Sequence, residues 1–86
     1  MSSLQRFATE PIRGKTISDT PGVQCDHQFS AEGINKAYQL VGKYLTYHMD
    51  NDLFGAWLED YIPRGSDRHL IIKACKTWCQ EHELQG

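Results

Sequence analysis

Three residues near the C-terminus have side chains that could bind a metal ion. Cys75, Cys79 and His82 are spaced by four and then three residues, so a helix would place them on one face. Thiolates and imidazoles are common zinc ligands, but a structural zinc site needs four ligands, and His27 or His69 would have to complete this one. Buried thiols on the apolar face of a helix explain the same spacing. We therefore expect no metal and no cofactor.

The same residues do not favour catalysis. A cysteine–histidine nucleophile pair needs a pocket and a third group that orients the histidine. No segment of this short chain suggests such a pocket. We expect a protein that is not an enzyme and has no catalytic residues.

A second group of residues could bind phosphate through the backbone. The segment Thr20-Pro21-Gly22-Val23-Gln24 separates two stretches that could each form a short helix, and Thr20-Pro21 is typical of a helix start. In a helix-hairpin-helix, the N–H groups of the turn point at a phosphate, with the N-terminus of the second helix behind them. Binding of this kind ignores base sequence, because nothing reaches the base edges. From these residues alone, a plain connection that needs one glycine for its turn is the favoured explanation of the segment.

Composition fits one small globular domain. The 86 residues are 40% hydrophobic, carry a net charge of −2 and include three cysteines, so we expect a single domain over residues 1–86 in a reducing compartment. An isoelectric point near 6.0 excludes a global basic field, and DNA binding would depend on a local arrangement of groups. We expect no membrane insertion, because no apolar run approaches the roughly 20 residues of a membrane helix.

Hydrophobic periodicity predicts an all-α bundle of five or six short helices. Apolar residues recur at steps of three and four along most of the last fifty residues. The expected apolar stripes include Ile34, Ala37, Tyr38, Val41 and Tyr44 or Leu45, and then Leu70, Ile71, Ala74, Cys75, Trp78 and Cys79. Asp50 and Ser66 are residue types that cap helix N-termini, and Pro63 and Gly65 should separate the last two helices. The expected helices cover Leu4–Thr9, Gln24–Ala31, Ile34–His48, Asp50–Tyr61 and Ser66–Cys79.

Several short motifs, in their order and spacing, resemble the barrier-to-autointegration factor family. They are Phe7-x-x-Glu10-Pro11 with Gly14-Lys15, Gly33-Ile34-Asn35-Lys36-Ala37-Tyr38, Gly42-Lys43-Tyr44-Leu45, Asp50-Asn51-Asp52-Leu53-Phe54 with Trp57-Leu58, and Trp78-Cys79. Together they cover most of the chain. The sequence is identified from them as a divergent, barrier-to-autointegration factor-like member.

The resemblance implies a compact, SAM-like helical domain with a degenerate helix-hairpin-helix. It also implies a symmetric dimer, formed with itself or with a family relative, that bridges two DNA duplexes without sequence preference. The family's further partners are LEM-domain proteins of the inner nuclear membrane, lamins and histones. These partners imply a location at chromatin and the nuclear envelope, and also in the cytoplasm. The positions implied for the dimer and partner surface are Gly42, Leu45, Leu53 and Trp57.

The resemblance also implies a DNA-binding set, and the chain departs from the family within it. The implied positions are Ser3, Arg6, Gly22, Val23, Gln24, Arg64, Arg68 and His69. Gln24 replaces the second glycine of the family's hairpin, and Ser3 and His69 replace basic residues. Each lost phosphate contact should weaken binding and flatten its salt dependence. Two functions remain open: weakened DNA binding, or a DNA-binding-deficient paralogue that pairs with a competent relative or docks a LEM domain.

Overall fold

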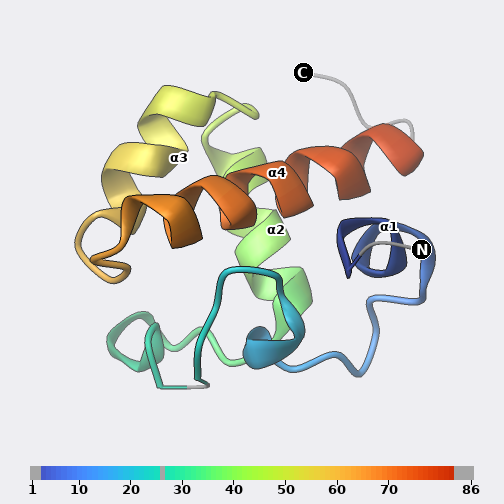
Figure 1. Cartoon of the computed structure of the whole chain (residues 1–86), viewed down its shortest axis with the longest axis horizontal. Helices are drawn as coiled ribbons and strands as arrows, with labels where there is room; N and C mark the ends of the chain where they lie inside the picture. The colour runs from blue at the N-terminus through green and yellow to red at the C-terminus, as the bar shows by residue number, and fades with distance from the viewer. Residues whose placement is uncertain (1–2, 26, 83–86) are drawn as a thin grey trace.

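Four α-helices and two short 3-10 turns form the regular structure of the described residues, 3–25 and 27–82, in the computed structural model (Figure 1). Their bounds are α1 Ser3–Thr9, η1 Ile17–Asp19, η2 Ser30–Glu32, α2 Ala37–Thr46, α3 Asn51–Leu58 and α4 Gly65–Glu81. The predicted all-α class is confirmed. The number of α-helices among these residues is four, not the five or six that we expected.

The longest helix, α4, is the element on which the others pack. It contacts α1, α2 and α3, with α3 beside its N-terminal half and α1 beside its C-terminal half (Figure 1). Its inward side chains Ile71, Ala74, Cys75 and Cys79 are all buried, as the predicted apolar stripe requires. Leu70 was expected in that stripe but is 40% exposed. None of the helices described here combines the length and apolar character needed to cross a membrane.

Helix α2 passes behind α4 and contributes most of the expected core residues, with one exchange (Figure 1). Leu40, Val41 and Tyr44 are buried, whereas the expected core residue Tyr38 is 53% exposed. Leu45 also lies at the surface. The helical periodicity was therefore correct, but the buried face is rotated toward Leu40.

The connections between the last three helices follow local rules in part. Asp50 caps α3 as predicted, because its Oδ1 accepts the N–H groups of Asp52 and Leu53 at 2.9 and 3.1 Å. Before it, His48 and Met49 adopt left-handed φ angles of 57° and 60° that reverse the chain. The Ser66 cap was wrong. Helix α4 begins at Gly65, which was expected in the connection, and its N-cap is Arg64, two residues before Ser66.

The first third of the chain differs most from expectation. The helix over 4–9 is confirmed as α1, but the described residues of 24–31 form no α-helix, and the regular structure among them is the start of η2. Phe29 is fully buried and stacks on Trp57 at 5.4 Å, so this segment is drawn toward α3. The backbone N–H of Gln24 bonds the side chain of Gln28, and such local bonds compete with helix formation.

Candidate nucleic-acid interface

The predicted phosphate-binding turn packs directly on α4. Gly22 has a φ of 95°, and a Cβ there would lie 2.4 Å from the carbonyl oxygen of Asp67 and 2.8 Å from Cγ1 of Ile71. Thr20 and Val23, on either side of the Pro21-Gly22 pair, are buried. Glycine is therefore required at position 22 both for its backbone angle and for its close approach to α4.

Two backbone N–H groups of the turn already have partners inside the protein. The N–H of Val23 donates to the carbonyl oxygen of Thr20 at 3.0 Å, which closes the turn. The N–H of Gln24 donates to Oε1 of Gln28 at 2.8 Å. The described residues directly after the turn form no α-helix, so the helix dipole that we expected behind these amides is missing. At these two amides, the expected outward-facing phosphate site is not formed.

A buried carboxylate lies beside the turn. Asp67 is 7% exposed, and its Oδ2 accepts a hydrogen bond from Nε2 of Gln24 at 3.3 Å. Nε of Arg64 lies 4.0 Å from the same oxygen, but most of the Arg64 side chain is exposed. Arg64 can thus offer charge to an anion, whereas the Asp67 carboxylate opposes one. No motif indicated that Asp67 and Gln28 would contact the turn.

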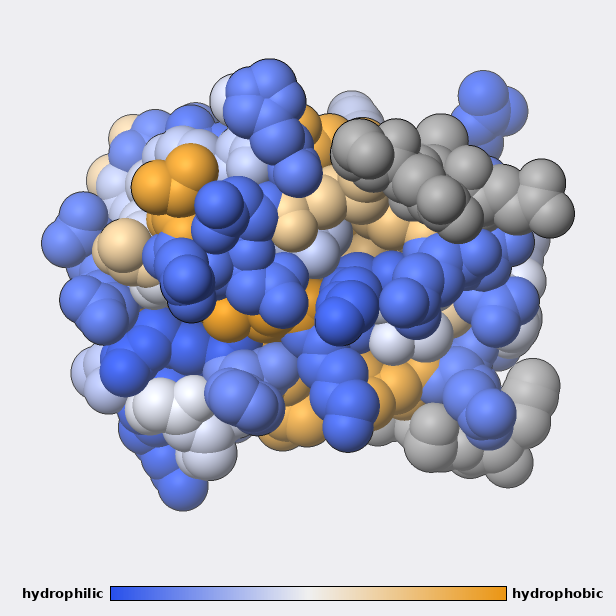
Figure 2. Space-filling model, turned by 90° about the horizontal axis from the view of Figure 1, so that it is seen from above, coloured by the Kyte–Doolittle hydropathy of each residue, from blue (hydrophilic) through white to orange (hydrophobic). Residues whose placement is uncertain are grey.

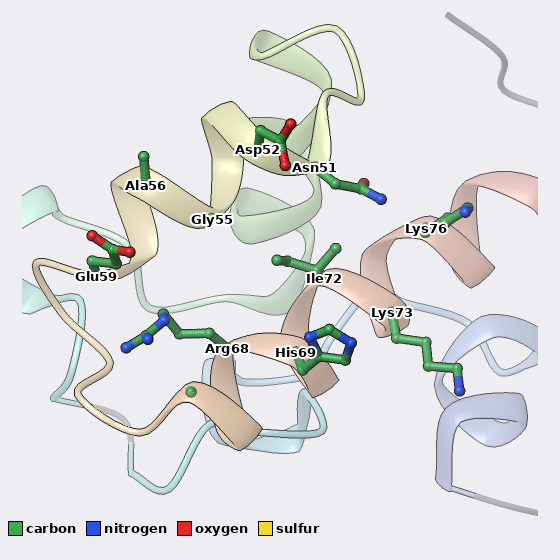
Figure 3. Close-up of a pocket in the computed structure, with 11 residues that line it drawn as sticks. Asn51, Asp52, Gly55, Ala56, Glu59, Arg68, His69, Ile72, Lys73 and Lys76 are labelled. Atoms are coloured by element: carbon green, nitrogen blue, oxygen red, sulfur yellow. The ribbon is translucent and has the colours of Figure 1, made fainter.

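The other basic residues of the predicted DNA-binding set lie elsewhere. Arg68 and His69 line a groove between α3 and α4 (Figure 3). Nη1 of Arg68 donates to the carbonyl oxygens of Ile62 and Pro63 at 2.7 and 3.1 Å, so this guanidinium stabilises the loop before α4.

The N-terminal members of the set are on α1. Arg6 is exposed there, and no hydrogen bond or ion pair found among the described residues joins it to the turn. Ser3 begins α1, and its side chain lies outside the described part. The structure therefore brings Gly22, Gln24 and Arg64 together around Asp67 and does not join Arg6 to them.

The predicted partner surface is partly open. Tyr38, Gly42 and Leu45 follow one another at helical spacing on α2, and Leu53 on α3 is 52% exposed. Trp57 is only partly exposed, because it stacks on both Phe29 and Phe54. Apolar side chains also reach the surface in small separate areas on the face seen in Figure 2. Leu45 and Leu53 are thus available for contact, while Trp57 mainly supports the core.

Cys75, Cys79 and His82 pack against other side chains of the protein. Cys75 and Cys79 are buried in the core, and burial raises the pKa of both thiols. The His82 ring stacks on Trp78 at 4.0 Å, and its Nδ1 lies 2.8 Å from the Trp78 carbonyl oxygen. Over residues 3–25 and 27–82, no three His, Cys, Asp or Glu side chains are placed to hold a metal ion.

Comparison with known proteins establishes the family. The family model described as barrier to autointegration factor matches residues 2–82. The chain belongs to the barrier-to-autointegration factor family. It is 29% identical over 76 residues to barrier-to-autointegration factor A of Xenopus laevis, covering 85% of this chain and 84% of that protein. The human barrier-to-autointegration factor is 28% identical over 76 residues, covering 85% of each chain, and the Drosophila melanogaster one is 25% identical over 80 residues, covering 90% and 89%. The resemblance inferred from the motifs is confirmed.

Proposed function

We propose that this protein is a nuclear, chromatin-associated member of the barrier-to-autointegration factor family that binds duplex DNA weakly and without sequence preference. Family membership supports the chromatin role. The observation that supports DNA binding is the packing of Gly22 on α4 at Asp67. The exposed guanidinium of Arg64 also lies near Asp67, so the turn and this cation are close together. Contacts from such groups go to phosphate and do not read bases.

The weakness of the binding follows from the same geometry. Gln28 occupies the N–H of Gln24, and the Asp67 carboxylate lies where it repels a phosphate. Few cations remain near the turn, so few counterions are released when DNA binds. The salt dependence should therefore be shallow, with a slope of about one or two on a log–log scale.

Fluorescence anisotropy with short duplexes tests this function. Several unrelated duplexes should bind with similar affinity at low salt. Arg64→Glu should weaken binding at least about fivefold, whereas Arg13→Glu, in the exposed loop after α1, should have a smaller effect. Absence of binding by the wild type at low salt would exclude DNA as its ligand.

A second function is favoured by the exposed apolar side chains. In this alternative, the protein pairs with itself or a relative through Gly42, Leu45 and Leu53, and docks LEM-domain proteins or lamins while contributing little to DNA binding. Two observations support it: Leu45 and Leu53 are exposed, and the Gln24 N–H of the turn is already bonded to Gln28. Bridging of two duplexes would then need a DNA-competent partner subunit.

Sedimentation analysis tests the pairing. Leu53→Asp should shift the protein toward the monomer. Leu70→Asp is a matched control, because Leu70 is a similarly exposed leucine on α4 that lies outside the proposed surface. A wild type that stays monomeric alone and with a family relative would rule out the pairing.

A further inference from the structure

A groove with walls of opposite charge separates α3 from α4. Its volume is about 790 Å³. The α4 wall carries His69, Lys73 and Lys76, and the α3 wall carries Asp52 and Glu59 (Figure 3). Leu53 and Trp57 are not among its lining residues, so the groove is distinct from the predicted partner surface.

No ion pair found among the described residues joins the two walls of the groove. Ion pairs within the described residues join Lys15 to Glu10 and Arg64 to Asp67, and neither pair crosses the groove. Lys73 and Lys76 therefore face solvent on one side, and Asp52 and Glu59 do so on the other. Unpaired charges held apart by the packing of two helices are available to a bound molecule at little reorganisation cost.

The groove also has a length and an apolar element. His69 and Lys76 are seven positions apart, as are Asp52 and Glu59, the residue that directly follows α3, and seven helical steps correspond to about 10 Å. Ile72 points from α4 toward α3 between the walls (Figure 3). Gly55 faces it from α3, and a Cβ added to Gly55 would approach Cδ1 of Ile72 to 3.4 Å, so the two helices pack closely there. Ile72 stays partly exposed at the floor of the groove, where one apolar side chain of an occupant can cover it.

We propose that this groove docks a short, charge-striped peptide segment of a partner protein. Acidic side chains of the segment lie against Lys73 and Lys76, a basic side chain lies against Asp52 and Glu59, and one apolar side chain covers Ile72. Duplex DNA is a poor occupant, because its phosphates would meet the carboxylates of α3 and it carries no cation for them. A peptide with both signs of charge satisfies both walls at once.

A synthetic helical peptide tests the proposal. It carries glutamates on one face, lysines on the opposite face and a leucine between them. We expect saturable binding by calorimetry, with amide chemical-shift changes confined to the lining residues of α3 and α4. The paired changes Lys73→Glu and Lys76→Glu should weaken binding at least about tenfold, and Arg13→Glu should leave it unchanged.

A second variant and two further ligands keep the test decisive. Ala56→Trp fills the groove from an exposed position and should abolish binding while the circular dichroism spectrum stays that of the wild type. An all-glutamate peptide and a short duplex should both bind more weakly than the striped peptide. Equal or tighter binding of either one in the groove would overturn the proposal, and so would failure of the striped peptide to bind at millimolar concentration.

Discussion

The side-chain amide of Gln24 donates a hydrogen bond to the buried carboxylate of Asp67, 43 residues further along the chain, at 3.3 Å. This bond joins the predicted DNA-binding turn to the first turn of α4. It also holds a negative charge at the place where the family resemblance implies a phosphate. The residue that replaces the family's second glycine is therefore part of an internal network, and this network is the physical reason for the weak DNA binding that we propose.

Removing the Gln28 side chain should strengthen DNA binding. Gln28→Ala frees the Gln24 N–H from its 2.8 Å bond, so a phosphate can use that donor, and we expect roughly three- to tenfold tighter binding in an anisotropy titration. Gln28→Glu should weaken it, because a carboxylate would then occupy the amide.

Gln39→Ala is a matched control for these changes. Oε1 of Gln39 also accepts backbone N–H groups, those of Asn35 and Lys36, but it does so at the start of α2. Its loss should reduce thermal stability and leave DNA affinity unchanged. If Gln28→Ala binds no better than Gln39→Ala, the occupied amide is not what limits DNA binding.

Neutralising Asp67 should separate DNA affinity from stability. Asp67→Asn keeps an oxygen that can accept from Gln24 but removes the charge that opposes a phosphate, so DNA should bind several-fold more tightly. The same change removes a carboxylate from the first turn of α4, which should cost about 0.3–1 kcal/mol of folding free energy. Anisotropy and thermal unfolding measure the two effects. Unchanged affinity with reduced stability would show that Asp67 has a structural role alone.

The extent to which the sequence predicts the fold varies along the chain. Helix α3 was predictable because its signals are local: Asp50 caps it, and apolar residues recur at helical spacing after the cap. The stretch over Gln24–Ala31 was not, because its conformation depends on the stacking of Phe29 with Trp57, a contact between segments far apart in sequence. No local propensity encodes that contact.

The candidate site shows the same division. Gly22 could be identified from the turn chemistry of Pro21-Gly22, and it is confirmed as a left-handed residue. The proximity of Asp67 could not be identified, because it follows from the packing of the turn on α4. The resemblance placed Arg68 in the DNA-binding set, but the two hydrogen bonds of its guanidinium to carbonyl oxygens of the preceding loop could not be identified from the sequence.

Gly22→Ala should be the most destabilising of these changes. The added methyl group meets the carbonyl oxygen of Asp67 at 2.4 Å and sits on a residue with φ of 95°, so we expect a loss of about 2–4 kcal/mol. For a domain of this size, that loss lowers the melting temperature by roughly 10–25 °C. Gly14→Ala is the control, because Gly14 has a φ of 90° with nothing within 4 Å of an added Cβ. Equal melting temperatures for the two variants would mean that the contact with α4 contributes nothing.

The hydrogen bond between the Tyr61 hydroxyl and the Glu32 carboxylate should control stability at alkaline pH. It raises the pKa of Tyr61 from 10.0 to about 12, because the carboxylate accepts a hydrogen bond from the phenol and repels the phenolate. The folded state therefore favours the protonated phenol. The resulting contribution to stability is complete below pH 10 and is lost as the pH rises from 10 toward 12.

Tyrosinate absorbance during a pH titration measures this shift. Of the chain's four tyrosines, Tyr44 also has a raised pKa, caused by burial, so the wild type should show late-titrating absorbance from both residues. Tyr61→Phe should remove one late component, and Glu32→Gln should return the pKa of Tyr61 toward its ordinary value. Glu81→Gln, at the end of α4, is the control and should change neither. If Glu32→Gln left the late component in place, the Glu32 carboxylate would not be its cause.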